Sequence, residues 1–120
     1  MLIRRLVPLP ILLLVVLSCA PPATDGGFDS PNPAAKLYAM EQAVRAGDES
    51  AAARIVEQLD SDDPAVRMMA IESLRRLTGT TLGYDHSAAS ADRREAIGRW
   101  VQAVESGSMG TTGQEGAPDG

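Results

Sequence analysis

The sequence predicts an all-α fold, an α-α superhelix fragment made of two helical hairpins, with four helices over residues 32–105. Three observations predict this fold. A helix-start pattern occurs twice, apolar residues recur at helical spacing after each start, and both flanks of residues 32–105 lack periodicity. With 120 residues in total, the chain has room for one small domain.

The two helix starts carry the same residue types at the same places. Residues 32–41 read NPAAKLYAME, and residues 63–72 read DPAVRMMAIE. Asn or Asp caps the free amides of the first turn, and Pro suits the first helical position because no amide is needed there. Ala39 and Ala70 are small enough for a neighbouring helix to cross closely. We therefore expect two equivalent helices, each at the front of a repeat.

Each of these helices continues into a second one. The pair Gly47-Asp48 stops the first helix and caps the next, which we expect at 49–60 with the apolar face Ala52, Ile55, Val56 and Leu59. The third helix ends at Gly79 and carries Val66, Met69, Ala70, Leu74 and Leu77. The fourth helix is expected at 91–105, with Ile97, Trp100, Val101 and Val104 on its apolar side. These faces predict a single core that includes Trp100.

The second helix start carries a family motif. Residues 63–70, DPAVRMMA, match the pattern Asp-Pro-x-Val-Arg-x-x-Ala and resemble HEAT repeats of the short, phycobilisome-lyase-like type. The resemblance implies an α-α solenoid fragment used for protein binding. Because some proteins of this type are bilin lyases, a small enzyme or a chaperone of a small apolar ligand is an alternative. Solenoids usually need three or more units, so we expect two units to form a stack of modest stability or to dock on another protein.

The first 18 residues have the features of an export signal. Arg4 and Arg5 precede an apolar run over residues 6–17, which is too short for a membrane-spanning helix of about 20 residues. Ser18 and Cys19, the only cysteine of the chain, follow this run. This segment resembles a bacterial lipoprotein signal peptide, residues 1–18. A general secretory signal with an incidental Cys is the alternative.

By that resemblance, Cys19 becomes the lipid-bearing N-terminus, with a diacylglycerol and an amide-linked acyl chain such as palmitate. Two or three acyl chains anchor a protein stably to a membrane. Ala20, where Asp would favour inner-membrane retention, favours the outer membrane, facing the periplasm. Residues 19–31 are expected to be a flexible tether, in which Phe28 is docked or free, and residues 106–120 a disordered Gly-rich tail.

Composition excludes several classes of function. The chain has 11 Lys and Arg against 16 Asp and Glu, a net charge of -5, so general binding to nucleic acid is not expected. One Cys and one His give no ligand set for a zinc site, and the acidic run at 60–63 lacks the spacing of an EF-hand. We expect no metal and no cofactor, and we assign Asp63 to a helix cap.

The loop at 80–90 contains the residues closest to a catalytic set. Asp85 and His86 lie there beside two serines, but neighbours on one short loop point in different directions, and a relay needs each group oriented by packing. We expect the loop to be structural, with Leu82 and Tyr84 plugging the end of the stack. The protein is therefore predicted not to be an enzyme.

The candidate protein-binding residues form two polar ridges. They are Arg54, Glu57 and Gln58 on the second helix, and Glu95, Arg99 and Gln102 on the fourth. Matched ridges of long polar side chains could bind a charged or helical peptide, or could simply keep the surface soluble. The leading hypothesis is a membrane-tethered, non-enzymatic interaction module of the cell envelope with an unknown protein partner. A structural envelope lipoprotein without a specific partner is a further alternative.

Overall fold

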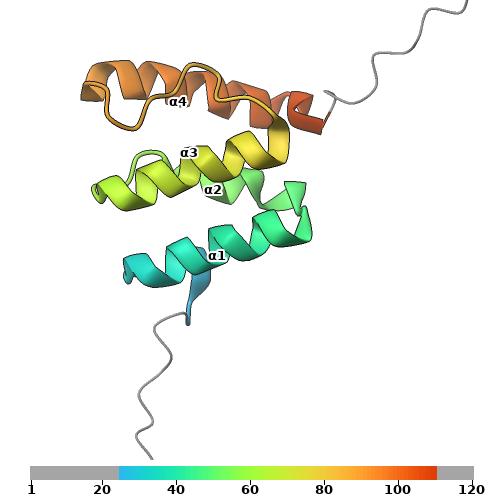
Figure 1. Ribbon diagram of the computed structural model, residues 1–120. Helices are drawn as coiled ribbons and strands as arrows, with labels where there is room; N and C mark the ends of the chain where they lie inside the picture. The colour runs from blue at the N-terminus through green and yellow to red at the C-terminus, as the bar shows by residue number, and fades with distance from the viewer. Residues whose placement is uncertain (1–24, 111–120) are drawn as a thin grey trace, which may run out of the picture.

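Four α-helices and three short 3-10 helices make up the computed structural model, which describes residues 25–110 (Figure 1). No strand occurs among these residues, so the predicted all-α fold is confirmed. The elements are η1 (Gly27–Asp29), α1 (Pro33–Ala46), η2 (Glu49–Ala51), α2 (Ala52–Gln58), α3 (Pro64–Thr78), α4 (Ser90–Glu105) and η3 (Ser108–Gly110).

The predicted signals at the ends of α1 and α3 are confirmed. Asn32 Oδ1 accepts a hydrogen bond of 3.0 Å from the Ala34 amide, and Asp63 Oδ1 accepts one of 2.8 Å from the Ala65 amide. Each cap is followed by a Pro at the first helical position. Gly47 and Gly79 end the two helices in the left-handed conformation, with φ of 61° and 82°, which residues with a Cβ seldom adopt.

The core lies between the four helices and contains the predicted apolar positions. Its fully buried members include Met40, Ile55, Leu59, Val66, Ala70, Leu74 and Trp100. Trp100 is completely buried, and its Nε1 donates a hydrogen bond of 2.9 Å to the Thr81 carbonyl. Val101 is an exception because it stays 40% exposed.

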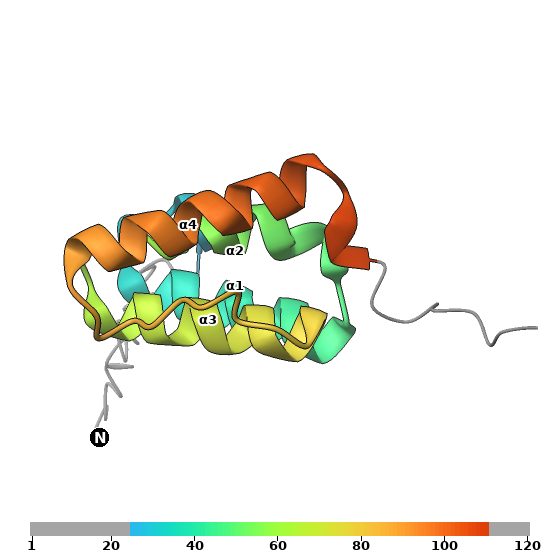
Figure 2. The same ribbon diagram turned by 90° about the horizontal axis from the view of Figure 1, so that it is seen from above.

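The direction of α4 differs from the hairpin that we predicted for the second repeat. α1 and α2 run in opposite directions, but α4 runs in the same direction as α3 (Figures 1 and 2). The reason is the loop at 79–89, which returns along α3 before α4 begins. Tyr84 Oη donates to the Leu59 carbonyl at 2.6 Å, and Arg67 Nε donates to the His86 carbonyl at 3.5 Å. As a result, α4 lies beside α2 and antiparallel to it.

Within residues 25–110, each flank of the domain contains a short 3-10 helix, η1 and η3. Phe28 of η1 packs against the core near α1, within the segment predicted as a tether. Met109 of η3 does the same from the segment predicted as a tail. Met109 lines a small hollow together with Thr78, Leu82, Trp100 and Ala103. Residues 1–24, Cys19 included, and residues 111–120 lie outside the described residues.

No helix within residues 25–110 combines the length and the apolar character that crossing a membrane requires.

Candidate functional site

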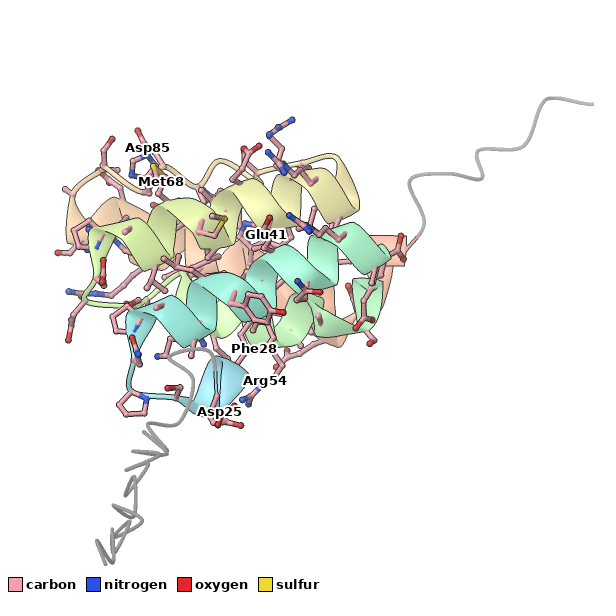
Figure 3. The ribbon with its side chains drawn as sticks, turned by 60° about the horizontal axis from the view of Figure 1, so that its bottom comes forward. Asp25, Phe28, Glu41, Arg54, Met68 and Asp85 are labelled. Atoms are coloured by element: carbon pink, nitrogen blue, oxygen red, sulfur yellow. The ribbon has the colours of Figure 1, made fainter. Side chains whose placement is uncertain are left out.

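The predicted ridge on α2 is used to hold η1 against the domain. Arg54 donates a hydrogen bond to Asp29 and forms an ion pair of 3.2 Å with Glu57. Its guanidinium carbon lies 6.0 Å from the centre of the Phe28 ring, a cation–π distance (Figure 3). The hydrogen bond and charge of Asp29 raise the pKa of Arg54. Arg54 therefore connects η1 to α2 and is not a free surface cation.

Gln58 does not belong to an exposed ridge. It is buried at 6% exposure, and its Nε2 lies 3.5 Å from the Arg54 carbonyl, to which it donates. α2 packs against both α3 and α4, which leaves little of this short helix exposed. Of the three predicted α2 residues, only Glu57 lines a groove on the surface.

The predicted ridge on α4 lies on the side of that helix away from this groove. Arg99 Nε donates to the Leu82 carbonyl at 2.8 Å, and its Nη1 pairs with Glu95 at 3.3 Å. Gln102 lines a shallow hollow with Leu82 and Arg99. The structure thus does not bring the two ridges to one surface. Arg54 and Arg99 each have a structural contact, so charge reversal at both would disturb the fold as well as any interface.

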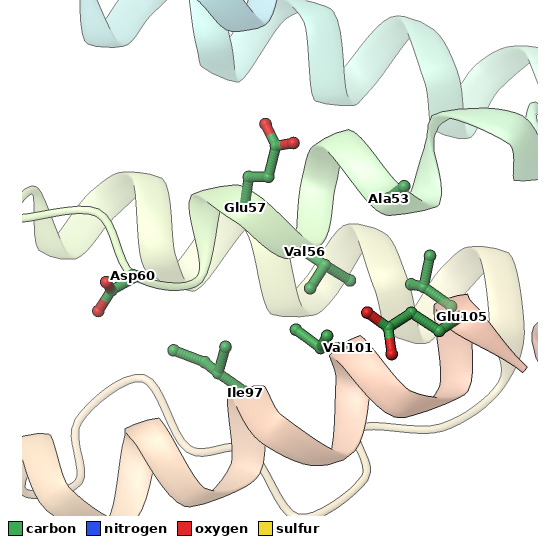
Figure 4. A pocket seen from close by; sticks show the side chains of 8 residues that line it. Ala53, Val56, Glu57, Asp60, Ile97, Val101 and Glu105 are labelled. Carbon is green, nitrogen blue, oxygen red and sulfur yellow. The ribbon is translucent and has the colours of Figure 1, made fainter.

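A groove between α2 and α4 is the surface that the sequence analysis missed (Figure 4). It has a volume of about 440 Å³. The apolar side chains of Val56 and Val101 face each other across it. The remaining lining residues are Ala53 and Glu57 of α2, Asp60 of the turn that follows α2, and Ile97, Val104 and Glu105 of α4.

Three carboxylate residues line this groove beside its apolar side chains. Glu57 pairs with Arg54, whereas Asp60 and Glu105 make no ion pair within residues 25–110. No Lys or Arg side chain is among the lining residues. The groove therefore combines apolar surface with negative charge, and Val101 leaves its floor open to solvent.

Comparison with known proteins identifies the repeats. HEAT repeats match residues 21–97, which is well over half of the chain. The chain belongs to the HEAT-repeat family. No curated protein and no solved structure gives a match. The match includes α1, α2, α3 and the start of α4, so both helix starts that we aligned lie inside it.

In this HEAT-repeat chain, the loop at 79–89 is positioned by hydrogen bonds that serve the fold. Asp85 Oδ1 accepts from the amide and the hydroxyl of Ser87 at 2.8 and 2.6 Å, and these bonds lower the pKa of Asp85. The backbone carbonyl of His86 accepts from Arg67 of α3. Asp85 therefore orients the loop rather than an imidazole, as expected for a structural loop.

The groove of this HEAT-repeat chain presents apolar surface and carboxylates. Its lining side chains are apolar or carboxylate, and no His, Cys, Ser or Thr is among them. Among residues 25–110, no three His, Cys, Asp or Glu side chains are grouped as a metal site would need. One signal in the sequence pointed to the groove: Val101 and Val104 widen the apolar face of α4 beyond what a single neighbouring helix covers.

Proposed function

We propose that the chain is a membrane-tethered, non-enzymatic protein-protein interaction module of the bacterial cell envelope. HEAT repeats generally mediate protein-protein interactions, and stacked helical repeats bind partners on the surface that the stack presents. The observation that carries the proposal is the groove between α2 and α4, where Val101 is exposed among apolar neighbours. Partner helices bind commonly in apolar grooves of this kind.

The membrane tether is proposed from the sequence. The apolar run at 6–17 followed by Cys19 supports lipid attachment at Cys19 after removal of residues 1–18. Ala20 supports the outer membrane, facing the periplasm. The few residues between Cys19 and Asp25 can span at most about 20 Å when extended. The domain would therefore meet its partner close to the lipid headgroups.

The non-enzymatic role is supported by how the groove and the loop are built. The groove presents carboxylates and valines, and Asp85 is engaged by Ser87 on another part of the surface. A bilin-lyase-like enzyme would need proton-donating and proton-accepting groups beside its ligand, and His86, the single His of the chain, is not among the residues that line the groove. A purely structural lipoprotein would not need an apolar groove left open to solvent.

Photo-crosslinking in intact cells tests the interaction. A benzophenone side chain is placed at Val101 in the groove or, as a control, at Met68 of α3, which is similarly exposed at 50%. We expect discrete crosslinked products from position 101 that position 68 does not give. Identical products from both positions, or none from position 101, would contradict a partner in this groove.

Mass spectrometry of the mature N-terminus tests the tether. We expect acyl mass on Cys19, and we expect Cys19→Ser to accumulate as an unprocessed or soluble form. An unmodified N-terminus at a different residue would show that the chain is exported without this lipid anchor.

A further inference from the structure

We propose that the α2–α4 groove binds a basic amphipathic helix of a partner protein, with its apolar side chains on the valines and its Lys or Arg side chains on the rim. This inference rests on the proposed interaction function and specifies the chemistry of the partner. It follows from three properties of the groove: its charge, its length and the helices that form its walls.

The charge of the rim selects a basic partner. Glu57, Asp60 and Glu105 are exposed and line the groove, and within residues 25–110 Arg54 is the only side chain that pairs with any of them. Arg54 is itself shared with Asp29 of η1. The rim therefore keeps net negative charge, and a cationic segment gains attraction that an acidic one would lose. An anionic lipid surface would be repelled by the same carboxylates.

The length of the groove fits about two helical turns. Its α4 wall extends from Ile97 to Glu105, a rise of about 12 Å at 1.5 Å per residue. A partner helix of that length places apolar side chains at i, i+3, i+4 and i+7 along one face. Val56 and Val101 lie in the middle of the floor, where such side chains would pack (Figure 4).

The walls favour a helix over an extended segment. Both walls are α-helices, whose backbone amides and carbonyls are used within the helices, so the groove offers no row of free backbone groups to an extended chain. A helical segment satisfies its own backbone and needs only side-chain contacts. The apolar floor and the acidic rim provide those contacts.

Three synthetic helical peptides of equal length test the proposal on the full chain in non-ionic detergent. The first carries Leu at i, i+3, i+4 and i+7 and Lys elsewhere on its polar face. The second replaces Lys with Glu, and the third keeps the Lys but disperses the Leu around the helix. Binding is measured by titration calorimetry, with each peptide titrated into detergent alone as the blank. We expect only the first peptide to bind, and higher salt to weaken it.

Matched variants locate the binding. The groove variant carries Glu57→Gln, Asp60→Asn and Glu105→Gln, and the control carries Asp25→Asn, Glu41→Gln and Glu49→Gln. Both change the net charge equally, and each removes one exposed ion pair, Arg54–Glu57 or Arg45–Glu41. We expect the groove variant to bind the first peptide about tenfold more weakly than the native chain does, and the control variant to bind it about twofold more weakly or less. Circular dichroism establishes that both variants fold.

The outcomes separate this inference from the proposed function. If the first peptide does not bind, binds no more tightly than the acidic one, or binds the groove variant unchanged, the basic-helix inference is wrong. The proposed function then still stands if position 101 crosslinks a partner in cells. If position 101 gives no crosslink in cells, the proposed function is wrong, and the basic-helix inference that rests on it is wrong as well. A crosslink of position 101 to a second copy of this chain would overturn the inference in favour of self-association.

Discussion

The Tyr84 hydroxyl donates a hydrogen bond of 2.6 Å to the Leu59 carbonyl, and both residues are buried. This bond joins the middle of the long loop to the end of α2. Burial raises the pKa of Tyr84, which keeps the hydroxyl protonated as a donor. The loop that carries Tyr84 runs back along α3 before α4 begins (Figure 2), and the Tyr84–Leu59 bond holds the loop in this course, which sets the direction of α4.

Removing this hydroxyl should destabilise the domain. Tyr84→Phe keeps the ring but leaves the buried Leu59 carbonyl without this donor, so we expect a loss of about 1–2 kcal/mol in the free energy of unfolding. Tyr38→Phe is the matched control, because Tyr38 is 47% exposed, and it should change stability by no more than about 0.5 kcal/mol. Denaturant unfolding followed by circular dichroism measures both. Equal effects would show that the Tyr84–Leu59 bond contributes nothing specific.

Enlarging Ala70 should overpack the crossing of the helices. Ala70 is completely buried in α3, so Ala70→Leu should cost about 1–3 kcal/mol in the free energy of unfolding. Ala65→Leu in the same helix is the control, because Ala65 is exposed and its extra atoms enter solvent. Thermal unfolding gives the comparison. An unchanged melting temperature for Ala70→Leu would mean that a cavity beside this residue accepts the larger side chain.

The end of the domain can be located by truncation. A chain that ends at Gly110 keeps η3, and it should unfold like the full chain. A chain that ends at Gly107 loses Met109, which packs against the core, and it should be less stable by about 1 kcal/mol. Denaturant unfolding of the two truncated chains tests this difference. If both were equally stable, the contact of Met109 would contribute no net free energy.

Acid should weaken the ion pairs of Glu72 in a defined range. Hydrogen bonds from Arg75 and then from Arg76 lower the pKa of Glu72 from 4.5 to about 2 in the folded protein. Because the folded pKa is depressed, this stabilisation is present above the unfolded pKa and is lost as the pH falls from about 4.5 to about 2. Glu72→Gln should be less stable than the native chain near neutral pH, and the two should converge towards pH 2.

Melting temperatures over this pH range measure the convergence. Glu49→Gln is the control, since Glu49 makes no ion pair within residues 25–110. The difference in melting temperature between Glu49→Gln and the native chain should not become smaller as the pH falls. A constant difference between Glu72→Gln and the native chain across the range would show that the Arg75 and Arg76 contacts do not stabilise the ionised carboxylate.

Local signals explain why the helices could be predicted. Asn32 and Asp63 cap the helices that follow them through contacts within two residues, and Gly47 and Gly79 end them through their own backbone conformation. Apolar spacing identifies the buried face of each helix for the same local reason. Trp100 is buried as that spacing predicted.

The direction of α4 and the position of the groove depend on contacts between distant residues. Helical periodicity identifies the buried face of a helix but not the direction in which the helix runs. A loop as long as 79–89 can lead into a helix that is parallel or antiparallel to α3. Arg54 and Arg99 both belong to the predicted polar ridges, yet Asp29 holds the first and the Leu82 carbonyl the second. Neither partner could be inferred from helical spacing.

The returning loop also has a consequence for the order of folding. α1, α2 and α3 connect through short turns, whereas α4 follows the long loop and packs against α2, whose last residue precedes the first residue of α4 by 32 positions. Contacts between distant residues require the closure of longer loops and form more slowly. We therefore expect α4 to dock last and to detach first in partial unfolding. Because α4 forms one wall of the groove, a ligand that binds there would slow this detachment and protect the amides of α4 from hydrogen exchange.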